Sequence, residues 1–260
     1  MAAAQKLRLE VRLVESGLVD SRERARALIL AGRVLVAEQK VDKPGTAVDA
    51  EAPLRLLGDD PPFVSRGGLK LAAALARWPI VIQGRCCLDI GASTGGFTDC
   101  LLQHGAAHVT AVDTGFGQIA MKLRIDPRVR LFERTNARLL APGSLKDGAF
   151  KDVRTEDGSA RRLTLLVMDV SFISVALVLP PVLAAAPDLT EAVILVKPQF
   201  EADREHVGKG GIVRDPAVHQ LAVDKVVDCV QSLSWRVVEV IPSPITGVKG
   251  NHEFLLYAKK

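Results

Sequence analysis

The sequence predicts an α/β protein in which a small α+β unit precedes a doubly wound, mostly parallel sheet. Three features support this prediction. Beyond about residue 80, apolar runs of strand length alternate with segments of helix length. A glycine-rich turn follows the first of these runs, and residues 6–43 carry nine basic residues against six acidic ones. A chain of 260 residues has room for two unequal domains.

Composition and charge are those of an ordinary globular chain, with 48% hydrophobic residues, 25% charged residues and a net charge of +4. The longest apolar stretch, 175–187, is shorter than the roughly 20 residues of a membrane-spanning helix and contains two prolines. No secretory signal opens the chain. We therefore predict a cytoplasmic protein without a membrane partner. The four cysteines lack the spacing of metal ligands, so no metal site is predicted.

The first elements to be predicted are two short helices. Apolar residues recur at helical spacing in 7–18 and again in 21–32. Residues 33–48 then alternate between apolar and polar, which predicts short paired strands with a turn near 38–40. Basic residues outnumber acidic ones along this unit, and arginines cluster at the start of the second helix. Such a cluster is either a phosphate-binding surface or a solvated helix face balanced by nearby acids.

The stretch SRERARALILAGRVLV, 21–36, resembles the core of the S4 RNA-binding domain. The Asn-Gly usual at the hairpin tip of that domain is replaced here by AEQK, 37–40. The resemblance implies RNA contacts from basic residues of the helix pair and the hairpin. These residues are Arg8, Arg22, Arg24, Arg26, Arg33 and Lys40.

A loop-rich segment with several prolines and glycines follows this unit and places a domain boundary near residue 60. Residues 69–77 then have a helical pattern that ends before Pro79. We accordingly predict three parts: a small domain at 1–60, a linker with a first helix at 61–82, and a larger domain at 83–260.

The larger domain begins a series of strands and helices. The predicted strands lie within 85–91, 108–113, 129–133, 164–172 and 192–200, with a last strand after Glu253. Helices are predicted at 97–106 and from residue 216. Strands that alternate with helices pair in parallel through right-handed crossovers, and ligands bind at the carboxyl edge of such a sheet.

At that edge the small residues of GASTGG, 91–96, let the backbone approach a ligand closely. Asp113 ends the neighbouring strand, where a carboxylate can accept hydrogen bonds from both hydroxyls of a ribose. The spacing G-x-x-x-G-G differs from the dinucleotide fingerprint, so a nucleoside without phosphates fits better. The alternative is a tight turn without a ligand.

The stretch LDIGASTGGFTDCLL, 88–102, resembles the first motif of class I methyltransferases, and especially of the FtsJ-type 2'-O-methyltransferases. This resemblance implies a Rossmann-like, seven-stranded, mostly parallel sheet and S-adenosyl-L-methionine as cofactor. For Asn136 a helix cap is an equally good interpretation. The cofactor-binding residues that the resemblance implies are Asp89, Gly91, Ala92, Ser93, Thr94, Gly95, Gly96, Phe97, Thr98, Asp113, Asn136 and Asp169.

Four charged residues interrupt or border apolar runs near the expected ligand edge: Lys70, Asp169, Lys197 and Glu253. A lysine at the end of a buried strand is partly desolvated, and a second lysine nearby disfavours its charged form. We therefore expect Lys197 to be the base that takes the proton of a 2'-hydroxyl. Lys70 is expected either to position that hydroxyl or to supply the neighbouring positive charge, and the two carboxylates to orient the amines. The alternative is a pair of structural ion pairs.

These four residues match the Lys-Asp-Lys-Glu tetrad of FtsJ-type enzymes. Together with FVSRGGLKL, MDVSFIS, VKPQFE and GKGGIVRD, they make the chain resemble, over 6–258, the TlyA family of rRNA cytidine 2'-O-methyltransferases, which are also labelled haemolysins. The resemblance implies ribosomal RNA or ribosomal subunits as partners, with further RNA contacts from Arg66 and Lys209.

Two other classes of function compete with an RNA methyltransferase. A secreted, pore-forming haemolysin is disfavoured because the sequence has neither an export signal nor a membrane-length apolar segment. An RNA-binding module with an inactive methyltransferase domain is disfavoured because all four charged positions are present. The polar insertion at 146–162 is predicted to be a surface loop that carries basic residues.

Overall fold

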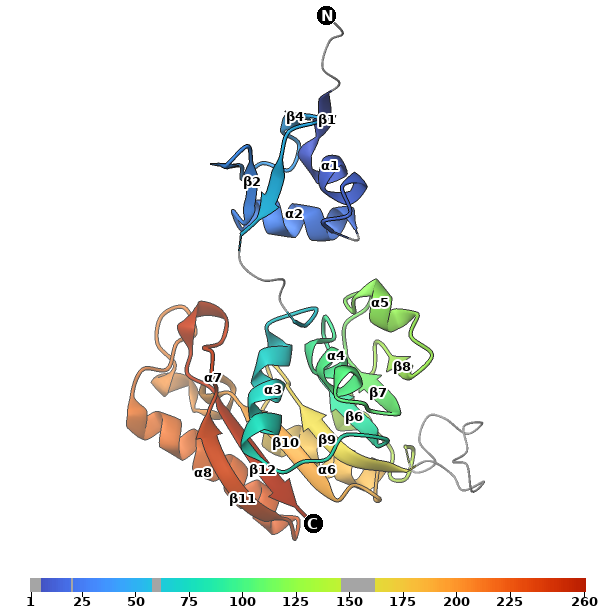
Figure 1. Cartoon of the computed structure of the whole chain (residues 1–260). Helices are drawn as coiled ribbons and strands as arrows, with labels where there is room; N and C mark the ends of the chain where they lie inside the picture. The colour runs from blue at the N-terminus through green and yellow to red at the C-terminus, as the bar shows by residue number, and fades with distance from the viewer. Residues whose placement is uncertain (1–5, 20, 58–61, 146–161) are drawn as a thin grey trace, which may run out of the picture. The chain divides into compact units, whose positions relative to one another are not determined.

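The computed structural model describes residues 6–19, 21–57, 62–145 and 162–260. The chain divides into two compact units, Met1–Asp60 and Pro61–Lys260 (Figure 1). Each unit has hydrophobic clusters of its own. The insertion predicted as a surface loop lies outside the described residues, apart from Arg162.

The two helices predicted for the smaller unit are confirmed as α1, Leu9–Glu15, and α2, Arg22–Leu30. The hydroxyl of Ser21 accepts the backbone N–H of Arg24 at 3.2 Å and so caps α2. Apolar side chains of both helices, among them the fully buried Leu13 and Ile29, form the core of the unit. Because the apolar residues recur at helical spacing, each helix has one apolar face, and the two helices are held together by packing of these faces.

Short strands complete the smaller unit: β1, Lys6–Arg8; β2, Val34–Val36; β3, Gln39–Lys40; β4, Ala47–Asp49; and β5, Leu54–Leu56. β2 pairs antiparallel with β3 and β5, and β1 pairs with β4. The β2–β3 turn lies at Ala37 and Glu38, slightly before the predicted position. Both residues have positive φ, 48° and 63°, which suits the twist of a two-residue hairpin even without Asn-Gly.

The larger unit contains one seven-stranded sheet in the order β11-β12-β10-β9-β6-β7-β8. Its strands are β6, Cys86–Ile90; β7, His108–Val112; β8, Val129–Phe132; β9, Leu163–Met168; β10, Glu191–Val196; β11, Arg236–Pro242; and β12, Phe254–Lys259. β6 to β10 pair in parallel, while β12 runs antiparallel to both β10 and β11. The predicted fold class is confirmed; β11 was not predicted.

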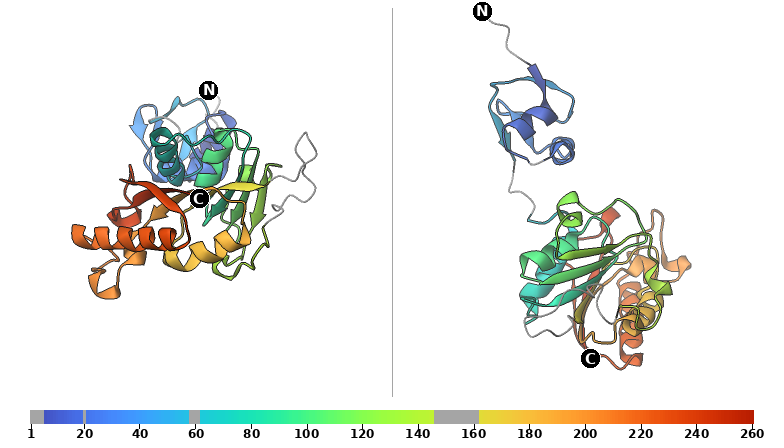
Figure 2. Two further views of the ribbon diagram at one scale, coloured as in Figure 1. Left: turned by 90° about the horizontal axis from the view of Figure 1, so that it is seen from below. Right: turned by 90° about the vertical axis from the view of Figure 1, so that its right-hand side faces the viewer.

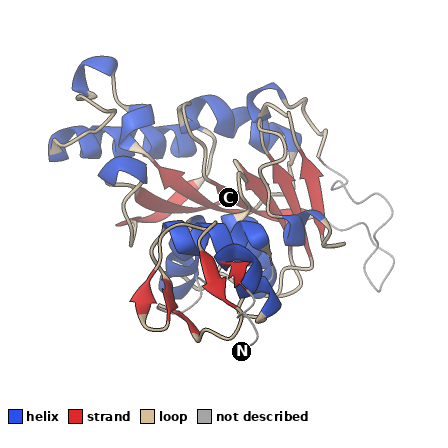
Figure 3. Cartoon of the chain, turned by 90° about the horizontal axis from the view of Figure 1, so that it is seen from above, coloured by secondary structure: helices blue, strands red, loops and turns tan. Residues whose placement is uncertain are grey.

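Helices cover both faces of this sheet, as Figures 2 and 3 show. The helical elements are α3, Gly67–Arg77; α4, Gly96–Gln103; α5, Met121–Arg124; η1, Ala137–Leu139; α6, Val175–Ala185; α7, Pro198–Glu201; η2, Arg204–His206; α8, Pro216–Ser232; and η3, Val248–Gly250. Successive strand residues point to opposite faces. Leu88 of β6 packs in the cluster with α6 and α8, and its neighbour Cys87 packs in the cluster with α3 and α4.

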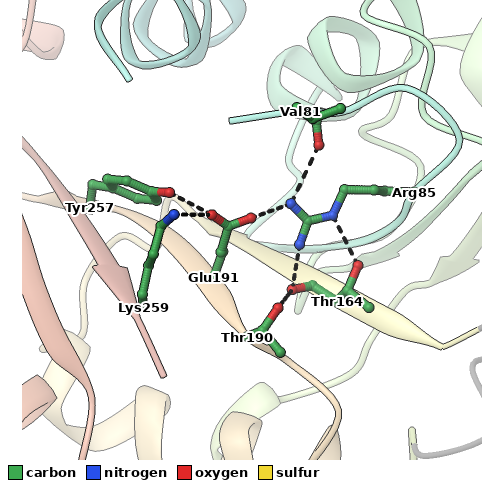
Figure 4. A network of polar contacts seen from close by, with 7 residues as sticks. All are labelled: Val81, Arg85, Thr164, Thr190, Glu191, Tyr257 and Lys259. Carbon is green, nitrogen blue, oxygen red and sulfur yellow. Dashed lines mark hydrogen bonds and ion pairs between the residues drawn. The ribbon is translucent and has the colours of Figure 1, made fainter. Parts of the chain in front are cut away.

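A polar network joins four strand termini at the end of the sheet opposite to the glycine-rich turn (Figure 4). Glu191 at the start of β10 accepts hydrogen bonds from the Tyr257 hydroxyl at 2.5 Å and from Lys259 Nζ at 3.1 Å, and it also pairs with Arg85. Arg85 in turn donates to Thr164 of β9, at 3.0 Å to the hydroxyl and 2.8 Å to the carbonyl. The network fixes the antiparallel β12 against the parallel strands.

We expect Glu191→Gln to destabilise this end of the sheet. Burial opposes ionisation of Glu191, but hydrogen bonds from Tyr257, Arg85 and Lys259 outweigh it and hold the pKa of Glu191 below its ordinary value. The resulting stability is present above the pKa of the unfolded state and is lost as pH falls through the folded pKa. Glu191→Gln is expected to lower the free energy of unfolding at pH 7 by about 2 kcal/mol.

Urea denaturation at pH 7 and at a pH below the ordinary pKa of glutamate, about 4.3, measures this effect. The deficit of the variant is expected to shrink in acid, and exposed Glu205→Gln is the control. A deficit that is independent of pH would contradict the role given to the carboxylate.

Candidate active site

A cavity of about 550 Å³ opens at the carboxyl ends of the parallel strands in the larger unit. Its volume is within the range of small-molecule binding sites. The glycine-rich turn after β6 forms one part of the wall, and all four charged residues singled out from the sequence line it as well: Lys70, Asp169, Lys197 and Glu253. The structure thus brings together side chains that lie up to 183 residues apart in the sequence.

These four side chains form two ion pairs. Lys70 Nζ lies 2.5 Å from Glu253 Oε2, and Lys197 Nζ lies 2.5 Å from Asp169 Oδ1. Both lysines are buried, each with 8% of its surface exposed, and Glu253 is 4% exposed. A buried ammonium group requires a partner of opposite charge, which each lysine has here.

Strand pairing explains how three of these residues meet. β9 and β10 are parallel neighbours, so Asp169 and Lys197 follow their strands at the same edge of the sheet. β12 pairs antiparallel with β10, with Phe254 opposite Val196. Glu253, immediately before β12, therefore lies beside Lys197. The carboxyl edge of the sheet supplies two carboxylates and one amine of the group.

The fourth residue, Lys70, comes from α3. This helix lies so close to α4 that a Cβ on Gly96, at the start of α4, would be only 2.9 Å from the backbone nitrogen of Gly68. The absence of a side chain at Gly96 thus permits the helix contact that positions Lys70. Gly96, which the sequence motif assigns to cofactor binding, therefore also has a packing role.

The glycine-rich turn is held close to the neighbouring strands. Gly91 has a φ of +86°, and a Cβ there would lie 2.4 Å from the carbonyl oxygen of Asp169. The carboxylate of Asp113, after β7, accepts the N–H of Ser93 at 2.8 Å and the N–H of Gly115 at 2.6 Å. These contacts keep the turn open and its backbone exposed to the cavity.

Asp89 lies beneath this turn and is fully buried. One carboxylate oxygen accepts the Thr98 hydroxyl at 2.6 Å, and the other has no hydrogen-bond partner among the described residues. Burial raises the pKa of Asp89 to about 7, and the negative charges of Asp169 and Asp113 contribute in the same direction. Three carboxyl groups at one edge of the sheet make this part of the site favourable for a cationic ligand.

The cofactor residues expected from the sequence fall into two groups. Those that line the cavity are Gly91, Ala92, Ser93, Thr94, Gly96, Phe97 and Asp169. The others do not line it: Asp89, Gly95, Thr98, Asp113 and Asn136. Asn136 accepts the N–H of Arg138 at 3.1 Å and caps η1, which is the alternative that the sequence left open.

Ser171 and Phe172 are among the residues of the site that were not predicted from the sequence. Ser171 accepts a hydrogen bond from Lys197 Nζ at 2.8 Å. Phe172 lines the cavity, is 92% exposed and has a φ of 64°, which is unusual for an aromatic residue. Its ring lies 5.2 Å from that of Phe200. The sequence contained a signal for Ser171 and Phe172, because both belong to MDVSFIS and follow a strand that ends in a charged residue.

The basic residues predicted to contact RNA are mostly on the surface. Arg8, Arg22, Arg26 and Lys40 are exposed in the smaller unit, whereas Arg24 and Arg33 are half-buried. Arg33 Nε donates to the carbonyl of Leu57 at 2.8 Å, so part of this side chain has a structural role. In the larger unit, exposed Arg66 lines the cavity and exposed Lys209 precedes Gly210, which also lines it.

Comparison with known proteins identifies both units. Residues 63–260 match the model of the FtsJ-like methyltransferase family, and residues 7–53 match that of the S4 domain. The 16S/23S rRNA (cytidine-2'-O)-methyltransferase TlyA of Mycobacterium tuberculosis is 44% identical over 257 residues, which is 98% of this chain and 91% of that protein.

Two further relatives carry a different name. Hemolysin A of Brachyspira hyodysenteriae is 38% identical over 255 residues, covering 96% of this chain and 99% of that protein. A structure solved under the name hemolysin, from Streptococcus thermophilus, is 39% identical, covers 99% of this chain and 90% of that chain, and has a TM-score of 0.69. Within the described part of the chain, no helix has the length and apolar character needed to cross a membrane.

We expect Asp89→Asn to change how stability depends on pH. A raised folded pKa gives stability that is present below the unfolded pKa, near 4, and is lost as pH rises through about 7. The asparagine does not ionise, so the Tm of the variant relative to wild type should increase between pH 5 and pH 8. Scanning calorimetry measures it, with Asp224→Asn on α8 as control. A Tm difference that stays constant over this range would contradict the raised pKa.

Proposed function

Because the chain belongs to the FtsJ-like methyltransferase family, we propose that it transfers a methyl group from S-adenosyl-L-methionine to a ribose 2'-hydroxyl of ribosomal RNA, with cytidine as the target nucleotide. The observation that carries this proposal is the pairing of Lys70 with Glu253 and of Lys197 with Asp169 in one cavity beside the glycine-rich turn. The TlyA relative supports the choice of RNA and nucleotide.

The cavity and the strand ends next to it fit this cofactor. S-adenosyl-L-methionine carries positive charge on its sulfonium and ammonium groups, which suits an edge with the carboxyl groups of Asp89, Asp113 and Asp169. The turn at 91–96 presents backbone to a ligand, and the half-buried Asp113 carboxylate has acceptor capacity for ribose hydroxyls. When bound, the cofactor supplies an electrophilic methyl group.

Lys197 is the proposed base. Its ammonium position is fixed by Asp169 and by the Ser171 hydroxyl, at 2.5 Å and 2.8 Å. In its neutral form, Nζ would take the proton of the 2'-hydroxyl as that oxygen accepts the methyl group that a bound cofactor would supply. Alignment matters because an alcohol is a weak nucleophile, and a base held by two contacts is pre-oriented for this transfer.

Lys70 has a different proposed role. Its pairing with Glu253 holds the ammonium group of Lys70 at the cavity, where this hydrogen-bond donor orients the 2'-hydroxyl oxygen. Glu253 prevents two uncompensated ammonium groups from facing each other in a buried site. In this proposal the pair of Lys197 and Asp169 serves proton transfer, and the pair of Lys70 and Glu253 serves orientation of the hydroxyl.

Phe172 is placed to contact the nucleotide that enters the cavity. A ring with 92% of its surface exposed, lining the same cavity as Lys197, offers a face on which a base can stack. In the smaller unit the exposed Arg8, Arg22, Arg26 and Lys40 supply contacts to RNA phosphates, which carry affinity more than sequence preference. We place this activity in the cytoplasm, where ribosomal RNA is found.

Lys197→Ala tests the proposed base. Loss of a general base typically reduces the rate by about 10² to 10⁴-fold, so we expect a decrease of that order in kcat. The measurement is incorporation of tritiated methyl groups into ribosomal subunits at saturating cofactor. Lys260→Ala, at an exposed lysine after β12 and at the end of the sheet away from the cavity, is the matched control and is expected to retain full activity. Wild-type kcat in Lys197→Ala would eliminate the base role.

The double variant Arg22→Ala/Arg26→Ala tests RNA binding by the smaller unit. We expect weaker binding to ribosomal RNA and a smaller dependence of log K on log salt, by about one unit for each phosphate that the variant no longer binds. The kcat at saturating RNA should not change, since neither residue lies in the cavity. Filter binding across a salt series measures the affinity for RNA and its salt dependence, with Arg236→Ala as control. An unchanged affinity would exclude these arginines from the interface.

A further inference from the structure

Two loops that are distant in sequence form one wall of the cavity. One is the glycine-rich segment 208–213, which lines the cavity through Gly210 and Gly211. The other is the segment 247–253, which includes η3 and lines it through Gly247, Lys249, Asn251 and Glu253. Hydrogen bonds between the two segments hold them in register, and most of these bonds involve a single side chain.

That side chain belongs to Asn251, which is only 3% exposed. Its Nδ2 donates to the carbonyl of Gly211 at 2.8 Å, and its Oδ1 accepts the N–H of Val213 at 3.0 Å. Both ends of the amide are therefore used across the same pair of segments. Lys249 adds a longer and more exposed contact, from Nζ to the carbonyl of Gly210 at 3.2 Å.

The segment that Asn251 grips is itself anchored to a helix. The carbonyl of Val213 lies 2.9 Å from Nε2 of His219 in α8, and the Val213 side chain is buried. The N–H and the carbonyl of Val213 are thus held from opposite sides, by Asn251 and His219. Through Val213, Asn251 therefore links α8 to the segment that leads into β12.

The other side of the connection leads to the tetrad. Glu253 is two residues beyond Asn251, and the carbonyl of Asn251 accepts the N–H of Gly247 at 2.8 Å. This bond brings Gly247 against the Glu253 carboxylate so closely that a Cβ on the glycine would lie 2.3 Å from Oε1. The position of Glu253 opposite Lys70 therefore depends on the conformation of segment 247–251.

We propose that Asn251 is a positioning residue for the methyl-transfer reaction: it fixes segment 208–213 against segment 247–253 and thereby holds the Glu253 carboxylate opposite Lys70. This inference rests on the proposed function. Both polar atoms of the Asn251 side chain are engaged with segment 208–213, so it acts through Glu253. An amide is required because one end must donate to a carbonyl and the other must accept an N–H.

Asn251→Ala in the full-length chain tests the proposal. We expect kcat for methylation of ribosomal subunits to fall by about 10- to 100-fold, the size of effect that a small misplacement of a reacting group produces. The affinity for S-adenosyl-L-methionine, measured by calorimetry, should change by less than about 3-fold, because the glycine-rich turn is intact. Any rise in KM for the subunits should be smaller than the fall in kcat, since segment 208–213 carries only Lys209 among the predicted RNA contacts. Gln220→Ala, which removes an exposed amide from α8, is the matched control and should behave as wild type.

A double-mutant cycle with Glu253→Gln separates positioning from a general structural role. If Asn251 acts through Glu253, adding Asn251→Ala to Glu253→Gln should cause little further decrease in kcat. An equal decrease in both backgrounds, or an effect confined to KM, would overturn the proposal. Should Asn251→Ala unfold below the assay temperature, Asn251→Asp takes its place under the same criteria, since it keeps the acceptor for Val213 and removes only the donor to Gly211.

The outcome for the wild type distinguishes this inference from the proposed function. Methyl incorporation by wild type together with full kcat in the Asn251 variants would remove the inference alone. Absence of incorporation by wild type would remove the proposed function, and the inference with it.

Discussion

The pairing of two buried ammonium groups with two carboxylates is the constraint on which the rest of the larger unit depends. Lys70 and Lys197 are each 8% exposed and are stable in that setting only with Glu253 and Asp169 beside them. Asp169 meets Lys197 because β9 and β10 are parallel neighbours, and Glu253 reaches the cavity because β12 enters the sheet antiparallel to β10. The order of the strands is thus inseparable from the charge balance of the cavity.

The opposite end of the sheet and α3 provide a rigid frame for this arrangement. Glu191 ties β12 to Arg85 and so to the parallel strands. Trp78, just after α3, stacks on Tyr257 of β12 with ring centroids 5.2 Å apart and donates to Glu239 of β11 at 2.7 Å. Since Lys70 lies near the start of the same helix, contacts at its far end help to set where this lysine meets β12. Stability and proposed chemistry share one set of strands.

One residue within this frame, Asp89, changes its charge near neutral pH. Asp89 is buried with one oxygen that lacks a partner among the described residues, and its pKa is raised to about 7. A protein that holds such a group at its glycine-rich turn is less stable near neutral pH than it would be with a neutral side chain there. A cation bound at this edge would offset the difference by favouring the ionised form, so the cofactor we propose would stabilise the fold as well as supply the methyl group.

The sequence by itself determined the alternation of strands and helices, the glycine-rich turn and the charged residues at strand ends, because each depends on local periodicity or on a short motif. It was enough to predict Lys70, Asp169, Lys197 and Glu253 as a group. Only the tertiary structure decided which lysine pairs with which carboxylate, that Phe172 is exposed at the cavity, and that Asn251 joins two loops of the cavity wall. These features depend on pairing between segments far apart in the chain, for which local pattern carries no information.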